Sequence, residues 1–421
     1  MYEAIVCKIK TREHPNADKL QLGLVAGFQV VVGLETENDE LGVFFPTDGI
    51  LSDEFCKAND LYSRFDESNN RLNSGFFTEG EARVRSQNFR GEKSYGYWCP
   101  LSSFDFIKNF DTSVLVDGYT FSSLGGVEIC KKHYSKATLK AISGNNKNVK
   151  RANSMFLEHV DTKQFRYRYK EVKPGSLVTI TSKMHGTSGR IARVLDEVPA
   201  KRNLVDKILR RTRTETKWNT LLGSRRVVLK DYDEDSLGFY GSNEFRYQTV
   251  KSFKDYLNKG ETIYYEIVGW ATEDTPIMAH DTSSLKVIRK EYGDRMVYSY
   301  GCAQGMAAIY VYRITQTNED GVSIELSWNQ IKARCNELGI NYTPEMCDPF
   351  VAKDSDSLKE LVDRLTSGKD ITDPSHIREG VVVRVDSDTG TMFLKNKSFD
   401  FGVLEGYIKD DENYVDLEEI S

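Results

Sequence analysis

Short runs rich in β-branched and aromatic residues recur along the whole chain, and they limit the fold more than any other feature. Such runs, separated by Gly, Pro and Asp-Gly turns, are typical of β-strands. Helical spacing is clearest in two stretches that end near a glycine. The strand-like runs are 2–10, 28–34, 176–182, 261–271, 306–315, 380–386 and 391–398, and the helical stretches are 327–340 and 357–368. The pattern predicts an α+β protein built mainly on sheets.

Composition divides the chain into four segments. Residues 1–125 contain short strands and turns, which predicts a small all-β module, a barrel. Residues 126–155 are rich in Lys, Ser and Asn and are expected to form a basic linker. Residues 156–405 mix strands with helices and predict a second domain, and residues 406–421 form an acidic tail.

Charge and cysteine spacing exclude several classes of protein. The net charge of −6 means that any nucleic-acid surface is local. The seven cysteines include no C-x-x-C pair, so neither a zinc site nor a disulfide framework is indicated. Reduced thiols favour an intracellular, cytoplasmic protein. The sequence has no apolar run of 18 residues, so no membrane is expected as a partner, and no obligate protein partner is evident.

The stretch TITSKMHGTSGR, residues 179–190, places a lysine where a strand-like run ends. Gly186 and the hydroxyl residues that follow would leave backbone N–H groups open to a phosphate. Lys183 in that setting can be a nucleophile if burial or nearby positive charge lowers its proton affinity. The alternative is a surface lysine before a β-turn, and the short motif alone does not decide between the two.

Four further stretches place charged side chains on or beside strands. Arg225 precedes an apolar run, Glu266 lies inside one, and Glu379 begins one. Lys395 and Lys397 are two residues apart and so face the same side of a strand. Each residue by itself could be a salt-bridged or snorkelling side chain, but the whole set in this order indicates a functional site.

The ordered set resembles the covalent nucleotidyltransferase superfamily, which includes DNA ligases, RNA ligases and mRNA capping enzymes. The matching stretches are K-M-H-G at 183–186, S-R at 224–225, Y-E-I-V-G at 265–269, A-I-Y-V-Y-R-I at 308–314, E-G-V-V-V-R at 379–384 and L-K-N-K at 394–397. His185, where DNA ligases and capping enzymes usually carry Asp, is more similar to RNA ligases. Two departures are Ser182, where many RNA ligases carry Glu, and Arg313, where the family carries Asp.

The resemblance implies a role for each matching residue. Lys183 would attack the α-phosphate of ATP and become lysyl–AMP. The residues implied in ATP binding are Lys183, His185, Gly186, Arg190, Arg225, Glu266 (ribose), Tyr312 or Tyr310 (purine stacking, with Tyr312 favoured), Glu379, Lys395 and Lys397. Glu379 would organise the catalytic Mg²⁺ or Mn²⁺, and Lys395 and Lys397 would contact the α-phosphate. The implied fold is a nucleotidyltransferase core of antiparallel sheets flanked by helices.

The N-terminal segment shows a second resemblance. H-P-N-A-D-K-L at 14–20, after the first strand, is similar to tRNA-binding OB modules of some aminoacyl-tRNA synthetases, and an OB module before the core is typical of one class of RNA ligase. The same residues could simply form a turn. Candidate contacts with RNA are His14, Lys19, Arg90, Lys93, Tyr95 and Trp98. The basic stretch 201–218 is either a second RNA contact or a solvated helix face.

These features predict an ATP-dependent RNA ligase that seals 3′-OH and 5′-phosphate ends of RNA or of an RNA-containing nicked duplex through lysyl–AMP and RNA–adenylate. The alternatives are a DNA ligase, a GTP-dependent guanylyltransferase, or a non-catalytic protein that binds RNA or senses its ends. His185 and the shortness of the segment after Lys397, which leaves no room for a C-terminal OB domain, argue against the first two.

Overall fold

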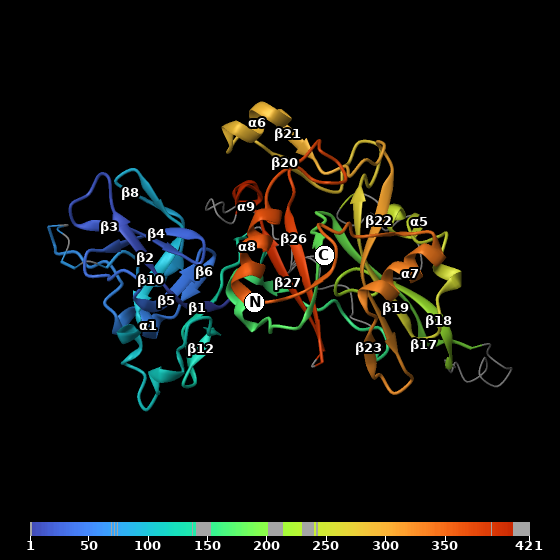
Figure 1. The fold of residues 1–421 in the computed structure, drawn as a ribbon, viewed down its shortest axis with the longest axis horizontal. Coiled ribbons are helices and arrows are strands. Elements are labelled where there is room, and N and C mark those ends of the chain that lie inside the picture. The colour runs from blue at the N-terminus through green and yellow to red at the C-terminus, as the bar shows by residue number, and fades with distance from the viewer. Residues whose placement is uncertain are drawn as a thin grey trace. The chain divides into compact units, whose positions relative to one another are not determined.

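The computed structural model describes residues 2–68, 70, 72–73, 75–136, 138–139, 153–200, 214–229, 240, 243–388 and 390–406. The chain divides into two compact units (Figure 1). Unit 1 is Met1–Lys140, Gln164–Glu171 and Gly402–Asp416, and unit 2 is Ala141–Lys163, Val172–Phe401 and Leu417–Ser421. The fold is α+β, as expected. In the part of the chain that the structure describes, no helix is long and apolar enough to cross a membrane.

Unit 1 consists of short strands with few helices. Its strands are β1 Ala4–Lys8, β2 Lys10–Glu13, β3 Leu20–Val25, β4 Phe28–Gly33, β5 Leu41–Pro46, β6 Gly49–Leu51, β7 Arg83–Val84, β8 Gln87–Phe89, β9 Glu92–Ser94, β10 Gly96–Pro100, β11 Thr120–Phe121, β12 Ser123–Leu124, β13 Val127–Glu128 and β14 Cys130–Lys132. Its helices are α1 Asp53–Ala58 and α3 Phe165–Arg168, with 3₁₀ turns at Leu101–Phe104, Thr112–Val114 and Tyr169–Glu171.

The expected N-terminal barrel is not confirmed. The described strands form separate sheets, with the orders β10-β5-β1-β11, β2-β3-β4 and β14-β6-β7 and the pairs β8-β9 and β12-β13, and none of these sheets closes on itself. Alternating apolar residues identify strands correctly but do not specify which strands pair. Buried aromatic side chains such as Phe44, Phe45 and Phe55 contribute to the hydrophobic core of unit 1.

Two expected domain boundaries differ from the structure. The stretch expected to be a basic linker begins with β13 and β14, and β14 pairs with β6 of unit 1. Residues Gln164–Glu171, expected in the second domain, belong to unit 1. Contacts between residues distant in sequence hold this segment in unit 1: Phe165 is fully buried, Arg168 forms an ion pair with Glu3 at 2.8 Å, and Lys170 forms one with Asp117. The described residues include none of the acidic tail beyond residue 406.

Unit 2 contains two larger sheets, which are antiparallel except for the parallel pairing of β22 with β24, and it carries longer helices. Its strands are β16 Leu177–Ser182, β17 Thr187–Pro199, β18 Thr214–Gly223, β19 Glu261–Gly269, β20 Ala279–Asp281, β21 Arg295–Val297, β22 Ala307–Thr317, β23 Ser323–Glu325, β24 Asn341–Tyr342, β25 Phe350–Val351, β26 Gly380–Ser387 and β27 Gly390–Lys397, with β15 Lys163–Gln164 at the boundary. Its helices are α5 Glu244–Gln248, α6 Lys286–Tyr292, α7 Trp328–Leu338 and α8 Ser355–Thr366, with a 3₁₀ turn at Lys254–Tyr256, and α9 Phe399–Glu405 follows.

Both helical predictions are confirmed. A capping box between Ser327 and Gln330 begins α7, and Gly339, with φ 65°, ends it in the left-handed conformation. Asp354 caps α8, because its carboxylate accepts a hydrogen bond from the Ser357 N–H. Helix α8 packs on β26 and β27, and α7 packs on β22 (Figure 1).

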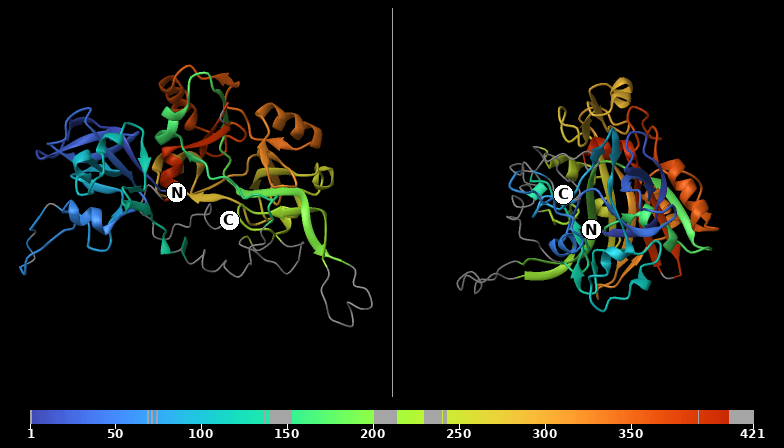
Figure 2. Two further views of the ribbon diagram at one scale, coloured as in Figure 1. Left: turned by 90° about the horizontal axis from the view of Figure 1, so that it is seen from below. Right: turned by 90° about the vertical axis from the view of Figure 1, so that its left-hand side faces the viewer.

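The order of the strands in unit 2 decides where its functional groups meet. One sheet contains β27, β26, β16 and β25 in this order, and the other contains β18, β17, β19, β22 and β23, with β24 beside β22. Figure 2 shows the far ends of β17 and β18 as a ribbon extending beyond their sheet. Of the basic stretch 201–218, residues 201–213 lie outside the described residues. Residues 214–218 belong to β18, so this part is a strand and not a helix face.

Candidate active site

The key charged residues lie together at one end of three neighbouring strands, where β16 and β27 end and β26 begins. Strand β16 ends at Ser182, so Lys183 is the first residue beyond the ladder, and its N–H donates to the carbonyl of Gly380 at 3.0 Å. Glu379 directly precedes β26, whose first residue, Gly380, lies opposite Lys397, the last residue of β27. Antiparallel pairing therefore places these side chains at one edge although they are far apart in sequence.

The three side chains form a compact buried ion cluster around one carboxylate. The Nζ atoms of Lys183 and Lys397 lie 2.7 Å and 3.2 Å from Oε1 of Glu379. Nδ1 of His185 lies 3.7 Å from Oε2 of the same residue. Glu379 is only 1% exposed, and a carboxylate so deeply buried needs opposite charges around it. The candidate nucleophile is thus in direct contact with the candidate metal ligand.

Gly186 permits the close approach of two strands next to the lysine. A Cβ atom at this position would lie 2.2 Å from the carbonyl oxygen of Ile267 in β19. No side chain larger than hydrogen fits there, so the glycine after Lys183-Met184-His185 is a packing requirement as well as an opening toward a ligand. The sequence analysis expected Gly186 to leave room for a phosphate, and the structure adds that the β19 backbone also requires a glycine here.

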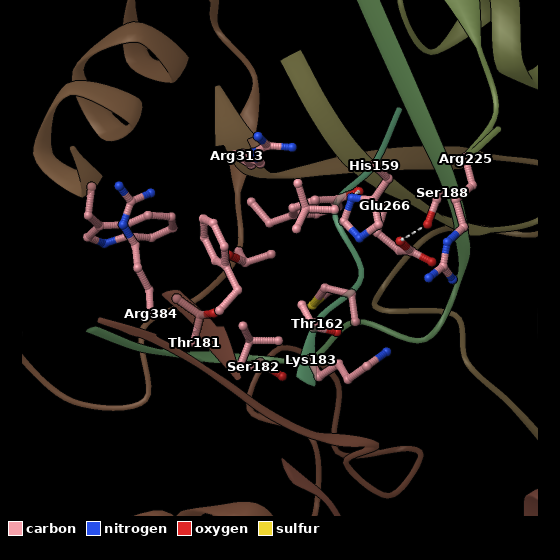
Figure 3. A pocket seen from close by; sticks show the side chains of 17 residues that line it. His159, Thr162, Thr181, Ser182, Lys183, Ser188, Arg225, Glu266, Arg313 and Arg384 are labelled. Carbon is pink, nitrogen blue, oxygen red and sulfur yellow. Dashed lines mark hydrogen bonds between the residues drawn. The ribbon is translucent and has the colours of Figure 1, made fainter. Parts of the chain in front are cut away.

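The pocket beside Lys183 lies between the two sheets of unit 2. Its lining residues are His159, Val160, Thr162, Thr181, Ser182, Lys183, Met184, Ser188, Arg225, Glu266, Tyr312, Arg313, Trp328, Thr343, Val382, Arg384 and Phe393. In Figure 3, Glu266, Ser188 and Arg225 lie on one side and Arg384 on the other. Ser188 of β17 pairs in register with Glu266 of β19, and its hydroxyl donates to Oε2 of Glu266 at 3.1 Å. The predicted ribose-binding carboxylate therefore lines the pocket.

A β-bulge distinguishes the two tyrosine candidates. Tyr264 pairs with Arg313 and Tyr265 pairs with Val311, so Tyr312 is an extra residue in β22. A bulge re-aims the side chain of the unpaired residue. Tyr312 lines the pocket, and its hydroxyl lies 3.2 Å from Nδ1 of His159. The ring of Tyr310 lies instead near that of Tyr300, with 6.4 Å between centroids.

Arg225 lines the pocket and forms an ion pair with Asp161. Burial alone would raise the pKa of Asp161, but the hydrogen bond and charge of Arg225 outweigh burial, so that this pKa falls below its usual range. Lys395 lies opposite Val382, which lines the pocket, and faces the same side of β27 as Lys397. Arg225 and Lys395 thus stand close to the predicted nucleotide site.

The guanidinium of Arg190, an expected ATP-binding group, binds backbone carbonyl oxygens of the protein instead. It is 2% exposed, and its guanidinium donates to the carbonyl oxygens of Phe156, Leu157 and Ser224. It also stacks on the ring of Phe156, 4.3 Å from the centroid. These contacts tie Arg190 to Phe156 and Leu157, which precede the pocket residue His159. With three backbone acceptors bound, the buried guanidinium is not oriented toward a ligand.

Sequence reasoning missed several pocket residues. His159, Trp328, Arg384 and Phe393 are not among the site residues that the sequence predicted. All four line the pocket. Arg384 lies in β26 and ends the motif that begins at Glu379, so the sequence indicates its place in the strand. The position of Trp328 depends instead on how α7 packs.

In unit 1 the structure joins the two stretches that were predicted to contact RNA. Nε2 of His14 lies 3.0 Å from the carbonyl oxygen of Phe89, and the side-chain amide of Asn16 donates to the carbonyl of Arg90 at 3.0 Å. Lys19, Arg90 and Lys93 are exposed and Tyr95 is half-buried. His14 and Trp98 are buried, at 7% and 5% exposure, and Trp98 packs in the core, so neither presents a ring to a base.

The family model described as RNA ligase matches residues 176–399. No curated protein matches the chain.

Solved structures of an RNA ligase from Naegleria gruberi share the fold. A variant with AMP and Mn has a TM-score of 0.55 at 14% identity, covering 97% of this chain and 99% of that chain. Another variant with ATP and Mn has a TM-score of 0.54 at 14% identity, covering 97% and 99%. The same ligase with PPi has a TM-score of 0.53 at 14% identity, covering 95% and 97%. Since the family model spans more than half of the chain and includes Lys183, Glu266, Glu379 and Lys397, the chain belongs to the RNA ligase family.

Proposed function

We propose that this chain is an ATP-dependent RNA ligase that joins 3′-OH and 5′-phosphate ends through lysyl–AMP at Lys183 and an RNA–adenylate. The observation that carries the proposal is the contact of 2.7 Å between Glu379 and Lys183, which lines a pocket that also contains Glu266 and Tyr312. A nucleophilic amine, a metal-binding carboxylate and a nucleotide pocket are the groups that nucleotidyl transfer requires.

In the first step the Lys183 amine attacks the α-phosphorus of ATP, an N–P bond forms, and pyrophosphate leaves. An ammonium group on a carboxylate must first lose a proton to become nucleophilic. Lys397 shares the Glu379 oxygen and can keep the carboxylate paired after Lys183 moves to the nucleotide. Tyr312 would stack on the purine, and Glu266, oriented by Ser188, would accept hydrogen bonds from the ribose hydroxyls.

Glu379 fits a divalent metal ion. Its carboxylate oxygens are the donors that Mg²⁺ and Mn²⁺ prefer, and Mg²⁺ commonly uses one or two carboxylates together with substrate phosphates. In this structure the Nζ atoms of Lys183 and Lys397 balance the Glu379 charge, so a metal ion would take over part of this role once the Lys183 amine has turned to the nucleotide. When bound, the metal would offset the Glu379 charge and the charge that develops on the phosphate oxygens. The ligands of the Naegleria structures, ATP or AMP with Mn, support the same choice of nucleotide and metal.

Later steps use the same pocket with RNA ends. The 5′-phosphate takes AMP from Lys183, and the 3′-OH then displaces AMP as the new phosphodiester forms. Arg225 and Lys395, beside the pocket, would hold phosphate groups at these stages. Unit 1 would act as an OB-like RNA platform, with the exposed Lys19, Arg90 and Lys93 contacting the backbone.

The test is covalent labelling of the chain. The protein is incubated with ATP labelled at the α-phosphate and Mg²⁺, and the products are separated under denaturing conditions. We expect a label that stays on the protein, is absent from the Lys183→Arg variant, and is released as ATP by added pyrophosphate, since the step is reversible. A protein that acquires no label, or acquires it equally in Lys183→Arg, rules out the proposal.

A further inference from the structure

The backbone around Lys183 is held on both sides by side chains from elsewhere in unit 2. The hydroxyl of Ser182, just before the lysine, donates to Oδ2 of Asp370 at 3.2 Å. The backbone N–H of His185, two residues after it, donates to the hydroxyl of Tyr300 at 2.6 Å. Both contacts are buried, so neither is replaced by water at low cost. Lys183 therefore lies between two fixed points.

Tyr300 occupies a strained turn. Its φ of 49° lies in the left-handed region, where a bulky side chain is rare and costly, and Gly301 follows with φ 77°. One carboxylate holds both flanks of this turn, because Oδ2 of Asp373 accepts from the Ser299 hydroxyl at 2.6 Å and from the Gly301 N–H at 3.0 Å. Strain of this kind persists only where surrounding contacts fix the conformation.

The two anchoring aspartates belong to one short loop. Oδ1 of Asp370 accepts hydrogen bonds from the N–H groups of Thr372 at 2.8 Å and Asp373 at 3.3 Å. The N–H of Asp370 donates to the carbonyl of His376 at 3.1 Å. The His376 ring packs edge-on against the Tyr300 ring, with 4.5 Å between centroids. The loop 370–376 and the turn 299–301 are therefore coupled, and together they hold the residues on either side of the lysine.

We propose that Tyr300, held by Asp373, is a positioning residue that sets the backbone of residues 183–185 so that the Lys183 amine meets the nucleotide. The strand ladder ends at Ser182, so the backbone beyond it is held by contacts such as the hydrogen bond from the Lys183 N–H to Gly380 and by this clamp, while the Lys183 side chain pairs with Glu379. A displacement of about 1 Å in a reacting group can lower a rate on the order of 10²-fold. This inference rests on the proposed function, because it assigns a role within lysine adenylylation.

The decisive variant is Tyr300→Phe, which removes the acceptor of the His185 N–H and keeps the ring. We expect the rate constant of self-labelling at saturating ATP to fall at least about tenfold, while the ATP concentration for half-maximal rate changes less than about threefold. Sealing of a nick that already carries AMP should stay within about threefold, because that step does not use the lysine as a nucleophile. A general loss of structure would lower both activities together.

Control variants separate positioning from stability. Tyr62→Phe removes a buried tyrosine hydroxyl that donates to Asp53 at 3.0 Å in unit 1, and it should label at the wild-type rate. Asp373→Ala removes the acceptor that holds the turn but keeps the Tyr300 hydroxyl, and it should reproduce the selective loss of labelling. Asp373→Asn retains an amide oxygen as acceptor and should recover part of the labelling rate. Asp373→Ala also provides the test if Tyr300→Phe does not fold.

Two outcomes overturn the clamp: Tyr300→Phe labelling as fast as the wild type, or labelling and sealing of the adenylylated nick falling equally in Asp373→Ala. In either case a wild-type protein that labels at Lys183 keeps the proposed function intact. A wild-type protein that does not label contradicts the proposed function itself, so the two failures are distinguishable.

Discussion

The Nζ atom of Lys183 lies 2.7 Å from Oε1 of Glu379, and Nζ of Lys397 lies 3.2 Å from the same oxygen. One carboxylate thus contacts both the candidate nucleophile and a second cation. If Lys183 is removed, Lys397 still balances the buried charge of Glu379. If Glu379 is removed, two partly buried ammonium groups are left facing each other. Substitution of Lys183 and substitution of Glu379 should therefore affect different steps of the reaction.

The first prediction concerns Lys183→Ala. This variant should form no lysyl–AMP and should not seal ordinary 5′-phosphate ends with ATP, since the nucleophile is gone. It should still seal an RNA nick whose 5′ end already carries AMP, because that step needs only the 3′-OH, the metal site and the phosphate-binding cations. The measurement is ligated product from each substrate on a denaturing gel.

Glu379→Ala is the matched comparison and should be inactive on both substrates. ATP-driven sealing of 5′-phosphate ends by Lys183→Ala would show that another residue carries AMP, and full activity of Glu379→Ala on the adenylylated nick would remove Glu379 from the metal site.

The second prediction concerns the purine. Ser182 lines the pocket, and its hydroxyl donates a hydrogen bond to Asp370. The Ser182 oxygen can therefore accept a hydrogen bond from the 6-amino group of adenine. The 6-carbonyl of guanine is itself an acceptor and could not form this bond. We expect labelling with ATP to exceed labelling with GTP at least tenfold, which requires only about 1.4 kcal/mol. Ser182→Ala should reduce this ratio without abolishing ATP labelling. Equal wild-type labelling by both nucleotides contradicts the assignment to ATP.

Sequence periodicity predicted the residues that lie at strand ends. Lys183, Glu379 and Lys397 follow or precede apolar runs that became β16, β26 and β27, so their convergence required only that these strands be neighbours. Local pattern also located Glu266, since a carboxylate inside an apolar strand needs a partner, and that partner is Ser188.

Residues whose role depends on distant packing could not be predicted in this way. The sequence predicts Arg190 as a phosphate ligand, but its guanidinium binds the carbonyl oxygens of Phe156 and Ser224, each more than 30 positions away. Trp98 is aromatic and near basic residues, yet the sheets of unit 1 bury it. Tyr300 and Asp373 match no motif, because a left-handed turn and its anchor are visible only in three dimensions.

The third prediction concerns unit 1. Lys19, Arg90 and Lys93 are exposed in the described structure, and their simultaneous change to Ala removes three positive charges without removing buried side chains. Sealing of RNA should weaken, and its dependence on salt should become less steep as phosphate contacts are lost. Self-labelling with ATP should remain, because all residues that line the proposed nucleotide pocket belong to unit 2.

The measurement is sealing at several salt concentrations, with the simultaneous change of three exposed lysines of unit 2, Lys251, Lys254 and Lys353, to Ala as a control for net charge. Unchanged sealing and an unchanged salt dependence in the triple variant would contradict an RNA platform at this surface.

The last prediction concerns His280, whose ring stacks on that of His185 at 5.2 Å between centroids and whose Nδ1 lies 3.0 Å from the Tyr298 hydroxyl. Burial, and then the positive charge of Lys397, lower the pKa of His280 to about 4. The unfolded chain, with a His pKa near 6.5, therefore binds more protons between pH 4 and 6.5 than the folded protein. Stability from this group is present above about pH 6.5 and is lost as the pH falls toward 4.

From pH 7 to pH 5 the loss should amount to about 2 kcal/mol of unfolding free energy. His280→Phe keeps an aromatic ring between His185 and Tyr298 but cannot be protonated. Urea unfolding of both proteins at pH 7 and pH 5 measures the difference, and we expect the wild type to lose more stability on acidification than the variant. Equal losses in the two proteins would mean that His280 is not held neutral beside the Lys183–Glu379–Lys397 cluster.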